Sequence, residues 1–81
     1  MSKFWYFSAM VIFIDRTLYY SGYVTSKEGL FPIDTAETQT KCYVSVPDGY
    51  DKVQNFKQVI ILNQVEVQGG RYDVWKEKMK F

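Results

Sequence analysis

Residues 4–14 read FWYFSAMVIFI, an apolar run that is interrupted only at Ser8. Aromatic and β-branched side chains favour extended backbone, so the sequence predicts a strand over residues 3–14. Both alternating faces of this strand are apolar, with Phe4, Tyr6, Met10 and Ile12 on one and Trp5, Phe7, Val11 and Phe13 on the other. A strand that is apolar on both faces is usually covered on both sides or lies in the middle of its sheet. We therefore expect the central strand here.

A signal peptide is the alternative for this run, with Lys3 as its charged start. The run has 11 residues, whereas a helix that crosses a membrane needs about 20. The charged pair Asp15-Arg16 follows it in place of a small-residue cleavage site. Composition and flanks favour the buried strand.

Residues 18–25 predict a second strand, rich in tyrosine and separated from the first by Asp15-Arg16-Thr17. Such a short separation indicates an antiparallel hairpin. Gly22 marks either a bulge or a place where a partner's bulky ring lies across the backbone. Tyr19 and Tyr23 share one face of this strand, and we expect Tyr6 across from it.

The next segment predicts a helix over residues 35–45, after a turn at 26–29 and an extended connector at 30–33. Asp34 is the expected N-cap, and Glu37 stands three residues later in the capping-box relation. The inward stripe would be Ala36, Thr40 and Tyr43 or Val44. The alternative is a strand over residues 42–46, with Cys42, Val44 and Val46 on one face.

The last third of the chain predicts a turn at 47–49, a loop or single helical turn at 50–57, a strand at 58–67 and a helix at 71–81. Tyr72, Trp75 and Met79 fall on one side of that helix. The predicted fold class is α+β: a two-layer sandwich of topology β-β-α-β-α, formed by residues 1–81 as a single domain. Its three-stranded antiparallel sheet has the order 2-1-3, with both helices on one face.

The chemistry-bearing residues of the chain do not form a catalytic pattern. The 81 residues include no histidine, the commonest general base and metal ligand, and one cysteine. Cys42 would need a lysine or a helix N-terminus to act as a nucleophile, and we interpret it as a core or half-buried residue. Asp48 and Asp51 lack the spacing of a calcium loop and are interpreted as a polar turn. We predict no enzyme, no catalytic residue, no cofactor and no metal.

The aromatic content indicates a contact function instead. Nine of the fifteen aromatic residues lie in the first 31 positions. One side of a three-stranded sheet with two short helices could not bury so many rings. Exposed apolar patches mark binding sites, and tyrosine and tryptophan are favoured contact residues. The predicted function is a non-enzymatic binding protein whose candidate contact surface is Trp5, Tyr19 and Tyr23. Its expected partner is another protein or a second copy of the chain, as a homo-oligomer.

A single-stranded nucleic-acid or nucleotide binder is the alternative function, with the same rings stacking on bases. The formal net charge of +1 does not favour it, because phosphate binding draws on a surplus of Lys and Arg. We expect no membrane partner. The sequence makes no prediction about a small-molecule ligand. The lone cysteine fits a reducing compartment, so the expected location is the cytoplasm.

The chain also resembles a group of small proteins of unassigned function from gut Bacteroidetes and phages. The resemblance rests on the aromatic opening strand, the Leu30-Phe31-Pro32 connector, the run Val59–Asn63 with Glu66-Val67, and the aromatic final helix. It implies a cytosolic bacterial or phage accessory protein, for which a host factor is a natural target. The stretch 41–56 departs from that group, where a longer helix and a shorter loop are expected.

Overall fold

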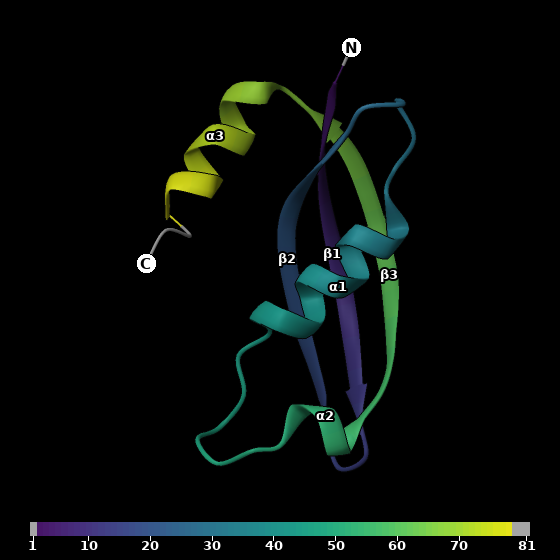
Figure 1. Ribbon diagram of the computed structural model, residues 1–81, viewed down its shortest axis with the longest axis vertical. Helices are drawn as coiled ribbons and strands as arrows, with labels where there is room; N and C mark the ends of the chain where they lie inside the picture. Colours follow the sequence, from purple (N-terminus) through teal and green to yellow (C-terminus); the bar gives the residue numbers. More distant parts are fainter. Residues whose placement is uncertain (1, 79–81) are drawn as a thin grey trace.

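The computed structural model describes residues 2–78 and has the α+β architecture that the sequence predicts (Figure 1). Its elements are β1 (Lys3–Phe13), β2 (Thr17–Ser26), α1 (Ile33–Tyr43), α2 (Lys52–Asn55), β3 (Phe56–Val67) and α3 (Gly69–Lys78). The strands form an antiparallel sheet in the order β2-β1-β3. The predicted class, β-β-α-β-α order and central first strand are confirmed, and α2 is the single helical turn expected within 50–57.

The strand register differs between the two sides of β1. β1 pairs with β2 without interruption, and Tyr6 lies opposite Tyr23. The pairing with β3 contains two register shifts, one between Ser8 and Ala9 and one between Ile12 and Phe13. At each shift β3 has one extra residue, Leu62 and Lys57, and extra residues of this kind bend a strand locally.

The hydrophobic core lies between the sheet and α1. Phe7, Ala9, Val24 and Ala36 form one buried cluster, and Val11, Phe13 and Val44 form a second. Thr40 is also fully buried, and its hydroxyl donates a 2.7 Å hydrogen bond to the Ala36 carbonyl. The predicted inward stripe is therefore right at Ala36, Thr40 and Val44, whereas Tyr43 is 51% exposed.

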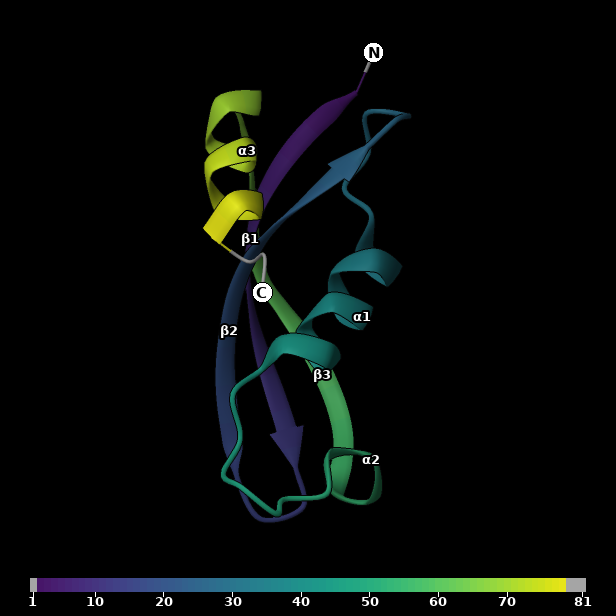
Figure 2. The same ribbon diagram turned by 60° about the vertical axis from the view of Figure 1, so that its left-hand side comes forward.

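The prediction that both helices cover one face is wrong. α1 packs on the face of Phe7 and Ala9, and α3 packs on the opposite face, where Tyr72 contacts Phe4 and Trp75 contacts Tyr23. Figure 2 shows the two helices on opposite sides of the sheet. β1 is apolar on both faces at its first half, so each face offers a surface for a helix.

The helix α1 begins and ends two residues before the predicted positions. Pro32 is its N-cap residue, and no side chain caps the helix, so Asp34 lies in the first turn instead of at the cap. Proline has no side-chain oxygen that could accept a hydrogen bond from the first-turn amides, so α1 starts without a side-chain cap. The chain is helical through Tyr43 and then extended without strand pairing, so the alternative strand over 42–46 is also wrong.

The remaining boundaries differ from the predictions by one or two residues, as is usual for element ends. β1 ends at Phe13, β2 extends over Thr17–Ser26, β3 begins at Phe56 and α3 begins at Gly69. The part of the predicted last helix at 79–81, with Met79, lies outside the described residues. The β1–β2 register is continuous at Gly22, so this glycine does not form a bulge.

Candidate protein-contact surface

The predicted contact residues do not share one face. Tyr19 and Tyr23 pair with Met10 and Tyr6, so they lie on the face that α3 partly covers, and the expected position of Tyr6 across from them is confirmed. Trp5 alternates with Tyr6 along β1 and lies on the α1 side, where its ring meets Phe31 edge-on at 6.0 Å. A strand sends successive side chains to opposite faces, so Trp5 cannot join the tyrosines.

Tyr23 is stacked rather than free. Its ring lies 5.2 Å from that of Tyr6 and 5.7 Å from that of Trp75, and Tyr72 continues the row toward Phe4. These aromatic contacts attach α3 to the first half of β1 and the last half of β2. Tyr23 therefore contributes to the docking of α3, and among the three candidates Tyr19 alone is strongly exposed, at 71%.

The helix α3 covers only part of the same sheet face, where it packs on β1 and β2. We define the open face as Met10, Ile12, Tyr19, Ile60 and Val65, which the strand register places on one side of the sheet. Val65 is 52% exposed, and Met10, Ile12 and Ile60 are partly exposed. Leu62, the residue passed over at the first register shift, is 51% exposed beside them. This cluster is apolar surface in contact with water.

A row of polar residues divides the open face. Ser8, Ser21 and Asn63 form this row across the sheet; Met10, Ile12, Tyr19 and Ile60 lie on one side of it, and Val65 lies on the other side, opposite Tyr6. The hydroxyls of Ser21 and Ser8 lower the pKa of the Tyr6 phenol, because hydrogen bonds to a phenolate favour its charged form. The open face itself has no charged member, which is typical of the centre of a protein interface.

The sequence missed the β3 part of the open face. Val65 alternates with Gln64 and Glu66, a pattern that indicates one solvated face, but the register shift that brings Leu62 alongside has no sequence signal. The uneven distribution of helices over the two sheet faces also leaves no mark in the sequence.

Cys42 is exposed, so the expectation of a core or half-buried cysteine is wrong. It lies in the last turn of α1, where the Lys52 ammonium donates hydrogen bonds to the carbonyls of Lys41 and Cys42 at 3.5 and 3.1 Å. A cavity of about 280 Å³ beside it is lined mainly by Phe13, Val53 and Phe56. Lysine here binds the negative end of a helix, which is a structural task.

Asp51, one of the two aspartates in the predicted polar turn, also has a structural role. The Asp51 carboxylate accepts a 3.0 Å hydrogen bond from the Gln54 amide and caps α2. Across residues 2–78, no group of three or more Cys, Asp and Glu side chains comes together in a way that could hold a metal ion.

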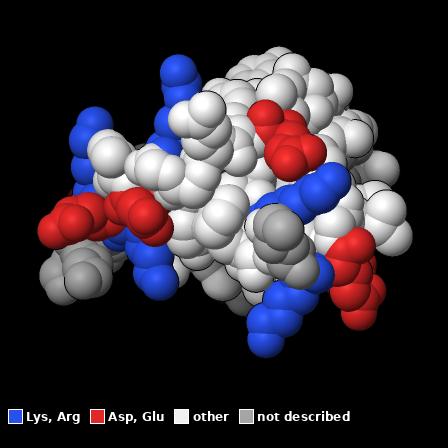
Figure 3. Space-filling view, turned by 90° about the horizontal axis from the view of Figure 1, so that it is seen from above, with Lys and Arg blue, Asp and Glu red and all other residues white. Residues whose placement is uncertain are grey.

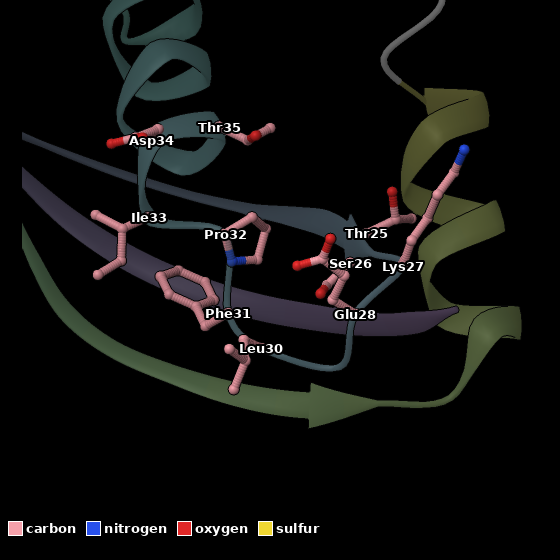
Figure 4. Close-up of a pocket in the computed structure, with 10 residues that line it drawn as sticks. All are labelled: Thr25, Ser26, Lys27, Glu28, Leu30, Phe31, Pro32, Ile33, Asp34 and Thr35. Carbon is pink, nitrogen blue, oxygen red and sulfur yellow. The ribbon is translucent and has the colours of Figure 1, made fainter. Parts of the chain in front are cut away.

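A larger hollow of about 500 Å³ lies between the end of β2 and the start of α1. Figure 4 shows Lys27 and Glu28 at one end and Asp34 and Thr35 at the other, with the ring of Phe31 between them. These side chains are spread around an open hollow. The residues that line it do not form a catalytic arrangement such as a nucleophile beside its base.

The charges of the molecule are dispersed. Figure 3 shows Lys and Arg interspersed with Asp and Glu over the face seen from above. In the described part of the chain, none of the helices is long and apolar enough to cross a membrane. No protein-family model, no curated protein and no solved structure matches the chain.

Proposed function

We propose that the protein is a non-enzymatic binding protein that contacts another protein through the open face. The observation that carries the proposal is the partly covered sheet face: α3 packs on β1 and β2 at one end, and Tyr19 on β2 and Val65 and Leu62 on β3 remain exposed. Apolar surface of this kind is costly to leave in water and usually serves a contact.

The surrounding chemistry supports a protein partner over a nucleic acid. The open face has no lysine or arginine among its members, and the net charge is +1. A surface that binds single-stranded nucleic acid combines stacking rings with a basic groove. An uncharged centre with a tyrosine and aliphatic side chains matches the core of a protein interface. The exposed free thiol of Cys42 is consistent with a reducing cytoplasm as the location.

A photo-crosslinking experiment in the native host tests this proposal. A benzophenone amino acid at Tyr19 should yield one defined crosslinked product with a protein other than this chain, whereas the same residue at Val53, which is 90% exposed in α2, should not. The Val65→Lys variant should abolish the Tyr19 product by placing a charge on the open face. Val74→Lys is the matched control, because Val74 is 58% exposed on α3.

Equal products from Tyr19 and Val53, or an undiminished product in Val65→Lys, would show that the open face is not the contact surface. A titration of fluorescent oligothymidylate at low salt separates the nucleic-acid alternative. Binding that weakens steeply with added salt would replace the protein-contact proposal.

A further inference from the structure

The edge strand β2 lacks the charges, prolines and bulges that normally protect a sheet edge, although α1 and α3 flank it beside Tyr23, Val24 and Thr25. In residues 2–78 it pairs on one side only, with β1. Its ten residues, TLYYSGYVTS, include no charged residue and no proline, and its register with β1 has no shift. Natural proteins guard long edges with charges, prolines or bulges, because unpaired backbone groups there accept another strand.

The opposite edge of the sheet is protected by comparison. β3 contains both register shifts and carries Lys57 and Glu66. The Glu66 carboxylate also lies 3.6 Å from the Lys3 ammonium, which holds a charge at that edge. The contrast between the two edges identifies β2 as the one able to accept a strand.

We propose that β2 pairs antiparallel with β2 of a second copy of the chain, around a twofold axis at Ser21. Two three-stranded sheets would thereby join into one sheet of six strands. A single uncharged strand is its own complement in this arrangement, as a twofold interface requires. The proposal goes beyond the proposed function, since it adds a contact with a second copy at the edge of the sheet. Tyr19 lies at the border between this edge and the open face and takes part in both contacts.

The register follows from the alternation of side chains. A twofold axis perpendicular to the sheet keeps every residue on its own face, so the axis must pass through a residue and not between two. With Ser21 at the axis, Tyr19 lies opposite Tyr23 of the second copy, and Leu18 lies opposite Val24. Each of these pairs joins residues of the same sheet face.

A cavity beside β2 lies where the incoming residues would run. It measures about 310 Å³ and lies along Tyr23, Val24 and Thr25, between α1 and α3. Tyr43 borders it from α1 and Trp75 borders it from α3. In the Ser21 register, Leu18 and Tyr19 of the second copy run along this stretch. The exposed ring of Tyr19 would then meet the aromatic row of Tyr23 and Trp75.

Charges at the two ends of the paired strands are complementary. The same register brings Asp15 of one copy alongside Lys27 of the other, and the symmetry repeats this contact at the opposite end. Both residues are exposed, and the Asp15 carboxylate already accepts hydrogen bonds from Tyr50 and Arg16, so Lys27 of the second copy would join an existing polar cluster. No like charges meet along the strand, because β2 has none.

A charge placed at the axis tests the proposal, because only an axial residue faces itself. Ser21 is exposed, so Ser21→Lys and Ser21→Glu each leave the single copy with a solvated charge. Sedimentation equilibrium should show a dimer for the unaltered chain and a dissociation constant raised at least about tenfold for each variant alone. An equimolar mixture of the two variants should dimerise again. Circular dichroism establishes that each variant is folded.

Asn63→Lys is the control, since Asn63 is exposed on the same sheet face but belongs to β3. Its dimer should match that of the unaltered chain. A monomeric unaltered chain, dimers of either Ser21 variant at the original affinity, a mixture that stays monomeric, or an equal loss in Asn63→Lys would each overturn the proposal. Failure of the open-face proposal is separate, because Val65→Lys is read by crosslinking and should keep the dimer mass.

Discussion

The Gln39 amide donates a 3.0 Å hydrogen bond to the Tyr20 hydroxyl, and the pair lies directly beside Gly22. This contact joins α1 to the edge strand β2 on the core face of the sheet. Burial raises the pKa of Tyr20, because the phenolate would lose its hydration there. The ring of Tyr20 lies over the Gly22 backbone. A bulky ring is expected here, but it comes from the same strand and not from a partner.

Gly22→Ala should therefore destabilise the fold. A β-carbon at this position would lie 2.6 Å from the Gln39 amide nitrogen and 2.8 Å from the Tyr20 hydroxyl. Overpacking of this kind typically costs about 1–3 kcal/mol. The free energy of unfolding from a urea titration measures the loss.

Gly70→Ala is the matched control for the glycine prediction. Gly70 lies in α3, and an added β-carbon would meet nothing within 4 Å. Alanine in a helix is more favourable than glycine by up to about 1 kcal/mol, so this variant should be equally or more stable. Similar losses in both variants would rule out the packing explanation.

The carboxylate of Asp15 has a pH-dependent role at the β1–β2 turn. The Tyr50 hydroxyl donates a hydrogen bond to it, and this bond is the main cause that lowers the pKa of Asp15 from its ordinary value of 3.8. A lowered pKa means that the stabilisation is present above pH 3.8 and is lost as the pH falls through the folded-state value.

Tyr50→Phe should raise the pKa of Asp15 toward 3.8, as a carbon-13 NMR titration of the carboxyl group can measure. Phenylalanine keeps the ring contacts with Phe13 at 5.3 Å and with the Arg16 guanidinium at 4.5 Å. The change therefore isolates the hydroxyl. An unchanged Asp15 titration would mean that the bond does not form in solution.

The helix α3 should open more easily than the rest of the fold. None of its residues that the structure describes is buried, and its main attachments are the ring contacts of Tyr72 and Trp75. Trp75→Ala should cost about 1–2 kcal/mol, since aromatic pairs contribute about 0.5–1.5 kcal/mol beyond their area. Phe7→Ala, at a fully buried site, should cost about 3–5 kcal/mol.

Native-state hydrogen exchange measures this difference directly. Amides of α3 should exchange through local opening, whereas those of β1 should follow global unfolding. Trp75→Ala should speed exchange in α3 and leave β1 unchanged. Equal protection of α3 and β1 would contradict the weak attachment.

The two aspartates at the starts of α1 and α2 give a fourth prediction. Asp51→Ala should cost about 1 kcal/mol, because its carboxylate caps α2. Asp34→Ala should cost only a few tenths of a kcal/mol, because Asp34 merely favours the positive end of α1. Thermal unfolding of the two variants compares them. A larger loss in Asp34→Ala would restore the capping role that the sequence predicts.

The sequence predicted the sheet because its signals are local. Residues 4–14 are apolar on both faces, and a run of this kind belongs in the centre of a sheet whatever surrounds it. The short break at Asp15–Thr17 likewise determined the hairpin and the shared face of Tyr19 and Tyr23. Alternation alone also separated Trp5 from these tyrosines, although the predicted contact surface combined all three.

The sequence determined that this is an α+β protein with β1 at its centre, since periodicity and turn residues act over a few neighbours. The tertiary structure alone decided that α3 covers the face opposite α1, that Tyr23 stacks under Trp75, and that Tyr19 stays exposed with Val65 and Leu62. Such relations depend on contacts between residues more than 40 positions apart, as between Tyr23 and Trp75, and on a register shift in β3. Hydrophobic pattern indicates which residues are to be buried, but not against which part of the chain.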